Sequence, residues 1–383
     1  MTPSRICTFC VMDDSMSGVV FDEAGQCNCC RDALARRAHE WWPNEVGEAK
    51  LLALVAALRR EGKGKPYDAM VGLSGGIDSA YLAHYMRTRF DLRLLAVHVD
   101  GGWNSEAAVR NIELLVRNLD MDLHTYVVEW TEMRDMQLAF LKASVLNQDI
   151  PQDHAFFATL YRTAHRFQIK SFLSGVNFSS ENISSPNIGF PSIDGVHVRG
   201  VHRTFGQTPL SSYPVMSLME FLWQTRVVRQ PAMYKPLNFI DYDKADAKQA
   251  LTLSYGWKDY GGKHSESRFT KFYQDIYLPR RYGFDKRRLH LSSLIVSGQL
   301  IREAALAELE TPILSEEQAR RDLKFVAKKL QLTVSELNAL IGSPPRAHTD
   351  FPNGSLLHGS LRRVRDLGRG VAGQLSGNQS VTS

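Results

Sequence analysis

The chain has 383 residues, 44% hydrophobic and 23% charged, so its composition is that of a folded globular protein rather than a disordered one. Lys and Arg number 46 against 41 Asp and Glu, and this net charge of +5 is too small to indicate nucleic-acid binding by itself. No apolar run approaches the roughly 18–20 residues of a membrane span, and no secretory signal is visible. We therefore expect a cytoplasmic protein of two or three structural units, with no membrane insertion and no nucleic-acid partner.

The five cysteines all lie in the first 30 residues. Cys7-x-x-Cys10 and Cys27-x-x-Cys30 have the spacing of a structural zinc site with four thiolate ligands. This unit, residues 1–40, is too small to bury a core, so we expect the metal to supply its folding energy. Cys29 is surplus and is an alternative ligand to Cys27 or Cys30. Reactive thiols and an iron–sulfur cluster are the alternatives to zinc.

Residues 67–86 predict a strand, a glycine-rich turn and a helix. The strand is the apolar run 69–73. The turn reads Ser74-Gly75-Gly76-Ile77-Asp78-Ser79 and is followed by apolar residues at helical spacing. Backbone N–H groups and a helix N-terminus then converge on one point, which favours a bound phosphate. The alternative is an ordinary tight turn with Ser and Asp caps. The turn matches neither the Walker loop nor the dinucleotide-binding glycine pattern.

This hexapeptide resembles the Ser-Gly-Gly-x-Asp-Ser signature of the N-type PP-loop ATP pyrophosphatases. The resemblance implies cleavage of ATP between its α and β phosphates, adenylation of a carbonyl oxygen, and displacement of AMP by a nitrogen or sulfur nucleophile. It implies that Ser74, Gly75, Gly76 and Ser79 hold pyrophosphate. It also implies that Asp78 lies near Mg²⁺, because a carboxylate beside phosphates needs a cation between them.

Strands predicted at 94–99, 123–128 and 169–173 alternate with helices from about 105 and at 156–167, which indicates a doubly wound parallel α/β sheet, as in the adenine nucleotide α-hydrolase-like fold. Ligands of such sheets bind beyond the carboxyl ends of the strands. The candidate segments are therefore 72–79, 98–104 and 174–181. The expected ATP site also includes Gly72, Leu73 and Gly175, and His98 and Val99 resemble the family position that contacts adenine through its backbone. In the third segment, Asn177, Ser179 and Glu181 are candidates to contact substrate.

Four regions are predicted along the chain. The zinc knuckle (1–40) precedes a PP-loop domain (41–240), whose residues 177–215 have weak periodicity and indicate an insertion or lid. A basic, mainly helical region (241–342) binds substrate or phosphate and ends in a small α-helical subdomain with helices at 306–309 and 316–340. Residues 343–383 are expected to form a flexible tail.

The basic region holds eight Lys or Arg against three acidic residues between 263 and 290. At helical spacing, Phe269, Phe272, Tyr273 and Ile276 form a stripe that we expect to be buried. A nucleic-acid patch has this composition, and so does a pocket for a nucleotide sugar and ATP, whose phosphates need cations.

Several motifs together resemble the WbpG-like N-acetyl sugar amidotransferases of bacterial surface-polysaccharide (lipopolysaccharide O-antigen) biosynthesis. These are the cysteine knuckles, the PP-loop, Val97-His98-Val99-Asp100-Gly101-Gly102-Trp103-Asn104-Ser105, and the stretch 256–270, which reads Gly-Trp-Lys-Asp-Tyr-Gly-Gly-Lys-His-Ser-Glu-Ser-Arg-Phe-Thr. The resemblance implies an ATP-dependent ligase that converts the acetamido group of a nucleotide-activated sugar to an acetamidino group. It implies ammonia supplied by a separate glutaminase and cyclase-like pair related to histidine-biosynthesis enzymes.

Within this resemblance, Lys263 and then Arg268 are the expected cations around the leaving pyrophosphate. The expected substrate contacts are Trp103, Asn104, Asp153, His154, Asn177, Asp259, Tyr260 and His264. A tRNA-thiolating or lysidine-type PP-loop enzyme is the main alternative, although sulfur transfer usually needs a cysteine near the loop and none follows Cys30. A non-catalytic zinc-knuckle adaptor is the third hypothesis.

Overall fold

The computed structural model describes residues 5–183, 190–228, 231–259 and 266–354. The helices are α1 (Asn28–Glu40), α2 (Glu45–Glu61), α3 (Ile77–Phe90), α4 (Glu106–Asn118), α5 (Trp130–Ala143), α6 (Ile150–Arg166), α7 (Phe178–Glu181), α8 (Gly195–Phe205), α9 (Leu218–Leu222), α10 (Lys244–Tyr255), α11 (Arg268–Phe272), α12 (Leu278–Tyr282), α13 (Arg287–Ser297), α14 (Arg302–Glu310), α15 (Glu316–Lys329) and α16 (Val334–Gly342). Shorter turns are η1 (Trp223–Val228), η2 (Pro236–Phe239), η3 (Tyr273–Tyr277) and η4 (His348–Asp350). Among these described residues, no helix is both long and apolar enough to cross a membrane.

The strands are β1 (Ala69–Gly72), β2 (Leu94–Asp100), β3 (Asp122–Val127), β4 (Ser171–Leu173) and β5 (Ala232–Tyr234). They form one sheet in the order β3-β2-β1-β4-β5, and all four pairings are parallel. The expected doubly wound parallel sheet is therefore confirmed, and only the short edge strand β5 was not predicted. The chain reverses its direction of winding between β1 and β4, which is where such sheets bind ligands.

Both faces of the sheet are buried at its centre, along β1, β2 and β4, whereas the edge strand β3 is largely exposed. Val71 and Ala96 pack on one face with apolar residues of α2, α3 and α4. Met70 and Leu95 point to the opposite face, where they pack with Leu160 of α6. The period-two alternation along β1 and β2 therefore fixes which helices cover which side.

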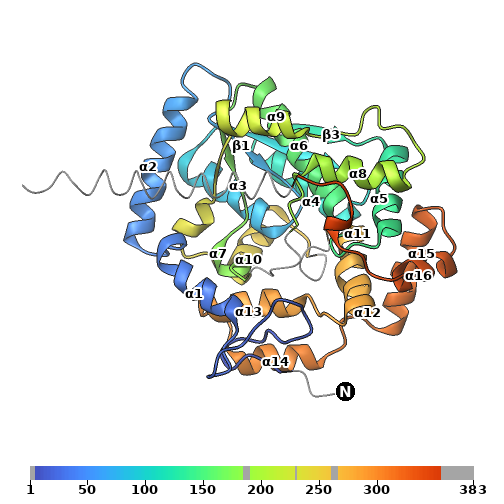
Figure 1. The fold of residues 1–383 in the computed structure, drawn as a ribbon. Coiled ribbons are helices and arrows are strands. Elements are labelled where there is room, and N and C mark those ends of the chain that lie inside the picture. Colours follow the sequence, from blue (N-terminus) through green and yellow to red (C-terminus); the bar gives the residue numbers. More distant parts are fainter. Residues whose placement is uncertain (1–4, 184–189, 229–230, 260–265, 355–383) are drawn as a thin grey trace, which may run out of the picture.

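Residues 266–342 are mainly helical, as predicted, and pack together with residues 5–30. Figure 1 shows the loops of the N-terminal segment lying beside α13 and α14. One apolar cluster includes the knuckle residues Cys7 and Met12 and the helical residues Leu289 and Val296. The expected stripe of Phe269, Phe272, Tyr273 and Ile276 belongs to the same cluster, and each of its side chains is at most 2% exposed.

Two segments expected to be irregular are more ordered than their sequence indicated. The segment 177–215 contains α7 and α8, and buried carboxylates anchor it: Glu132 accepts bonds from the backbone N–H groups of Ser211 and Ser212. Residues 343–354, which we expected in the flexible tail, pack on the body through His348 and Phe351, which are 8% and 4% exposed. The remaining tail residues lie outside the described part of the chain.

Buried histidines hold these two segments in place. His154 donates from Nδ1 to the Ser192 carbonyl (2.7 Å) and accepts at Nε2 from the Met216 N–H (3.0 Å). His348 accepts at Nε2 from the Asn147 N–H (3.2 Å), so its Nδ1–H donates to His197 Nε2 at 3.0 Å. A proton added to an accepting nitrogen would face another N–H group, so these rings are neutral in the fold.

We expect acid to destabilise the protein through these histidines. Burial lowers the pKa of His154 and of His197 to about 4, and that of His348 to about 3. The unfolded chain binds these protons near pH 6.5, so the stabilisation is complete above that pH and is lost as the pH falls toward 4. Each histidine that is protonated only in the unfolded chain lowers the free energy of unfolding by about 1.4 kcal/mol per pH unit. For the three histidines together, the free energy of unfolding should fall by several kcal/mol as the pH falls from 6.5 toward 4.

Denaturant titrations at pH 7.5 and pH 5 measure this loss. Acid also releases metal from thiolates, so the informative comparison is with His348→Gln, which should show a shallower pH dependence. Identical slopes for the two proteins would contradict the assignment.

Candidate active site

The glycine-rich turn between β1 and α3 has the open geometry of a phosphate cradle. Gly75 has a φ of +85°, and a Cβ there would lie 2.7 Å from that of Ala108, so only glycine fits. The Ser74 hydroxyl accepts from the Gly76 N–H (3.1 Å), and Ser79 donates to the Gly76 carbonyl (3.1 Å). The helix α3 begins after Gly76 with no side-chain cap, which leaves its first N–H groups for an anion.

The end of β4 closes against this turn. A Cβ on Gly175 would lie 2.8 Å from the backbone nitrogen of Ser79, so the two backbones meet where no side chain fits. The Asn177 side chain continues this contact, because its Nδ2 donates to the Gly175 carbonyl (3.1 Å) and to Asp78 Oδ1 (3.2 Å). The candidate segments 72–79 and 174–181 are therefore adjacent in space.

Two buried side chains orient the Asp78 carboxylate. Tyr242, which is 1% exposed, donates its hydroxyl proton to Asp78 Oδ1 at 2.6 Å, and Asn177 donates to the same oxygen. Burial, with the charge of Asp78 adding to it, raises the pKa of Tyr242 well above its ordinary value, so the hydroxyl keeps its proton. Sequence reasoning missed Tyr242, because no local pattern signals a contact that spans 164 residues.

Two cavities meet at the turn. The larger, of about 900 Å³, lies at the switch between β1 and β4; the smaller, of about 350 Å³, lies beyond β2 and beside α6. Both volumes are typical of ligand sites. Ser74, Phe156 and Glu266 line both cavities, so together they form one cleft.

Many predicted site residues line this cleft. Gly72, Ser74, Gly76, Asp78, Ser79, Gly175, Glu181 and Asp259 line the larger cavity, and Leu73, Ser74, His98, Val99, Asn104 and Asp153 line the smaller. His98 donates from Nδ1 to the Leu73 carbonyl (2.7 Å), and Asn104 Nδ2 donates to its Nε2 (3.0 Å). The His98 imidazole therefore joins the ends of β1 and β2 rather than standing free.

Two of the predicted substrate contacts, Trp103 and His154, are buried in the protein interior instead. Trp103 is 1% exposed and packs against Trp130 and Phe269 in the core, because its aromatic surface is removed from water there. The fully buried His154 is the structural histidine described above.

Arg268 pairs with Asp322 (3.0 Å), lies 4.2 Å from the centre of the Phe325 ring, and lines neither cavity. Lys263, Tyr260 and His264 lie outside the described residues. The larger cavity also contains Lys244 and Lys248, which the sequence did not single out; Lys248 pairs with Asp259.

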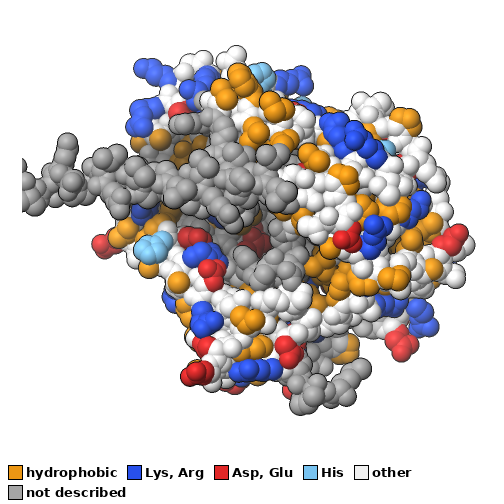
Figure 2. Space-filling view, in the orientation of Figure 1, with side chains coloured by type: hydrophobic (Ala, Val, Ile, Leu, Met, Phe, Trp, Pro, Cys, Tyr) orange, Lys and Arg blue, Asp and Glu red, His pale blue; other side chains and the backbone are white. Residues whose placement is uncertain are grey.

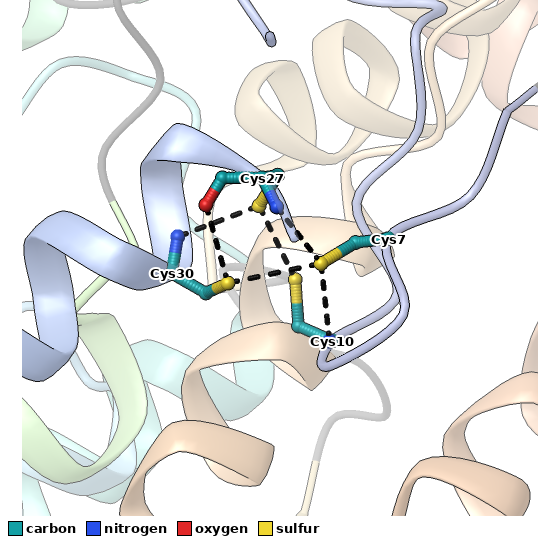
Figure 3. A group of neighbouring side chains, drawn as sticks. All are labelled: Cys7, Cys10, Cys27 and Cys30. Carbon is teal, nitrogen blue, oxygen red and sulfur yellow. Dashed lines mark hydrogen bonds between the residues drawn. The ribbon is translucent and has the colours of Figure 1, made fainter. Parts of the chain in front are cut away.

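At the N-terminus, the sulfur atoms of Cys7, Cys10, Cys27 and Cys30 all lie within 4.8 Å of one another. Figure 3 shows the four side chains pointing toward a common centre. The distances from Cys7 Sγ to Cys30 Sγ (3.7 Å) and from Cys10 Sγ to Cys27 Sγ (3.5 Å) are close to the roughly 3.8 Å between sulfurs of a tetrahedral zinc site. The Cys29 thiol points to Asn28 and is not one of the four, so the cluster can hold a metal ion without it.

The knuckle is attached to the C-terminal helices by polar contacts. The Arg302 guanidinium donates to the carbonyls of Cys7 (2.9 Å) and Cys10 (3.1 Å). Arg288 of α13 forms an ion pair with Asp13 at 2.9 Å. The cysteine cluster is therefore fixed by direct contacts to α13 and α14, two helices that also border the cleft.

Comparison with known proteins identifies residues 266–365 as a match to the C-terminal domain of WbpG-like LPS biosynthesis proteins. No curated protein matches the chain. Among solved structures, the NH3-dependent NAD synthetase from Campylobacter jejuni subsp. jejuni NCTC 11168 is 14% identical, with 78% of this chain and 97% of that chain covered and a TM-score of 0.30. The U34-tRNA thiolase NcsA from Methanococcus maripaludis is 13% identical, with 80% and 88% covered and a TM-score of 0.31. At such TM-scores neither likeness bears on function.

Proposed function

We propose that the protein is an ATP-dependent amidotransferase that converts the acetamido group of a nucleotide-activated sugar to an acetamidino group in surface-glycan biosynthesis. The observation that carries this proposal is the match of residues 266–365 to the WbpG-like domain, whose first residues border the glycine-rich turn. Glu266 lines both cavities, and Ser267 and Thr270 line the smaller one. ATP, the sugar and ammonia would all be cytoplasmic substrates.

In the proposed reaction the acetamido oxygen attacks the α-phosphorus of ATP, and pyrophosphate leaves. Ammonia then adds to the activated carbon, and AMP departs with the former amide oxygen. The N–H groups at the start of α3 and the hydroxyls of Ser74 and Ser79 bind the pyrophosphate. The Gly72–Ser79 turn positions the phosphates. The larger cavity, with Asp78 in its wall, places the acetamido oxygen close to the α-phosphorus of ATP.

Asp78 is suited to hold Mg²⁺. Its two described hydrogen bonds are both accepted by Oδ1, so Oδ2 would be the oxygen that binds a cation, and Mg²⁺ prefers carboxylate oxygen as a ligand. When bound, Mg²⁺ neutralises charge on the phosphates. At the knuckle we propose a structural zinc ion, because four thiolates complete its tetrahedral shell.

The ammonia would come from free ammonium or from a separate protein. No cysteine follows Cys30, so the chain has no thiol nucleophile for glutamine hydrolysis outside the knuckle region. We propose that a glutaminase and a cyclase-like partner supply it.

The ion pairs of the basic region weigh against the tRNA alternative. Lys271 pairs with Asp322 and Arg287 with Asp285, and Arg281 donates to the Ile341 carbonyl. In the lower half of the face drawn in Figure 2, Lys and Arg side chains alternate with Asp and Glu. These cations thus hold the C-terminal helices together rather than forming a surface for phosphates.

An oxygen-transfer experiment tests the proposed function. A nucleotide-activated N-acetyl sugar carrying ¹⁸O in its acetyl group is incubated with protein, ATP, Mg²⁺ and ammonium chloride. We expect AMP that contains one ¹⁸O atom, because the amide oxygen leaves with the α-phosphate, and no AMP when the sugar is omitted. Unlabelled AMP, or ADP as the product, would refute the proposal; AMP formed only with tRNA would favour the alternative.

A further inference from the structure

Tyr273 lines the smaller cavity, and its buried hydroxyl has no hydrogen-bond partner among the described residues. The residue lies in η3 and is 1% exposed. Burial, with the charge of Asp149 adding to it, raises the pKa of Tyr273 well above its ordinary value, so the hydroxyl is a donor. An unpaired buried hydroxyl destabilises a fold, so its presence in a cavity points to a ligand.

The wall around Tyr273 is rich in carboxylate, amide and hydroxyl groups. Thr270 Oγ1 donates to Asp149 Oδ1 (3.0 Å), and Ser267 Oγ donates to Gln152 Oε1 (2.9 Å). Asp149 and Asp153 lie one helical turn apart at the start of α6, and both line the cavity. Carboxylates accept from hydroxyls, and amides both donate and accept, so this set matches a ligand that carries several hydroxyl groups.

We propose that the smaller cavity binds a sugar ring through neighbouring hydroxyl groups, with the Tyr273 hydroxyl donating to the oxygen of one of them and the Asp153 carboxylate accepting from the other. The identity of the ring rests on the proposed function, which offers two sources: the ribose of ATP and the pyranose of the acceptor sugar. Either ring reaches the phosphate cradle, because Ser74 lines both this cavity and the larger one. The C-terminal region thus supplies part of the wall of this ring-binding site, through Ser267, Thr270 and Tyr273.

Calorimetric titration of the full-length protein with single ligands tests the proposal. The ligands are ATP with Mg²⁺, 2′-deoxy-ATP with Mg²⁺, and UDP-N-acetylglucosamine as the sugar probe, with UDP alone as its control. Tyr273→Phe removes only the hydroxyl and should weaken binding of the ligand whose ring it contacts about 5- to 10-fold. Asp153→Asn keeps the shape of the side chain and removes its charge, and should weaken the same ligand by about 10-fold or more.

Tyr277→Phe is a matched control on the same turn. The Tyr277 hydroxyl already donates to the Val145 carbonyl (3.0 Å) and accepts from Gln148 Nε2 (3.2 Å), and its side chain does not line this cavity. We expect the control to lose thermal stability and keep its affinities. Tyr273→Phe should keep its stability, because no bond within the protein is removed.

The outcomes separate the two sources. A wild-type preference for ATP over 2′-deoxy-ATP that disappears in Tyr273→Phe identifies the ribose. Weaker UDP-N-acetylglucosamine binding, with the binding of ATP and of UDP alone unchanged, identifies the pyranose. If both variants bind ATP and UDP-N-acetylglucosamine as the wild type does, the inference is wrong while the proposed function stands. If the wild-type protein binds none of the three ligands, both the proposed function and this inference are wrong.

Discussion

The double variant Ser74→Ala, Asp78→Ala should release AMP at least about 10²–10³-fold more slowly than the wild type. It should also lose some stability, because the buried donors Tyr242 and Asn177 lose their acceptor. Ser74 supplies a hydroxyl to the phosphate cradle, and Asp78 presents the only described side-chain carboxylate of the turn. Both side chains line the cleft, so the variant should still unfold cooperatively, at a lower melting temperature than the wild type. The measurement is AMP and pyrophosphate release with sugar, Mg²⁺ and ammonium chloride, alongside a thermal melt.

Asp91→Asn provides a control on the same helix. Asp91 ends α3 with a φ of 47°, a conformation that asparagine tolerates, and its carboxylate pairs with Arg87 at the exposed surface. This variant should retain full turnover. Tyr242→Phe should show an intermediate loss, because Asp78 keeps its bond from Asn177. Full pyrophosphate release by the double variant would show that the turn is not the ATP site.

Cys7→Ser should remove bound metal and lower the unfolding free energy by several kcal/mol, because metal binding and folding are one process in such clusters. The loss should extend beyond residues 1–40, since Arg302 binds the carbonyls of Cys7 and Cys10. Metal content by mass spectrometry and hydrogen exchange over α13 and α14 measure the two effects together.

Cys29→Ser is the matched control for the knuckle. Its thiol is buried at 5% exposure but lies outside the four-sulfur cluster. We expect this variant to keep its metal and nearly all of its stability. A Cys7→Ser protein with wild-type stability, or a wild-type protein that folds fully without metal, would contradict the prediction.

Local patterns predicted the parts of the fold that depend on short stretches of chain. The apolar run 69–73 and the turn Ser74–Ser79 are contiguous, so β1, the phosphate cradle and α3 were predicted close to their observed bounds. The two cysteine knuckles were predicted for the same reason, and the surplus Cys29 was assigned only by the structure.

Long-range packing decided the rest. Trp103 was expected to contact substrate because it follows a strand end, but its ring is buried by Trp130 and Phe269, from other elements. Arg268 was expected to bind pyrophosphate, yet Asp322 on α15 neutralises it. No spacing within one segment reveals such partners, and the same holds for Tyr242.

The contact between Arg302 and the first cysteine knuckle has a consequence for biosynthesis. Arg302 lies 295 residues after Cys7, so at about 5–20 residues per second the ribosome adds it roughly 15–60 s later. During that interval the nascent thiols have no docking surface, and metal captured early would be held by a segment still open to solvent. Synthesis of the segment that contains α13 and α14, rather than emergence of the cysteines, therefore sets when the N-terminal unit reaches its final stability.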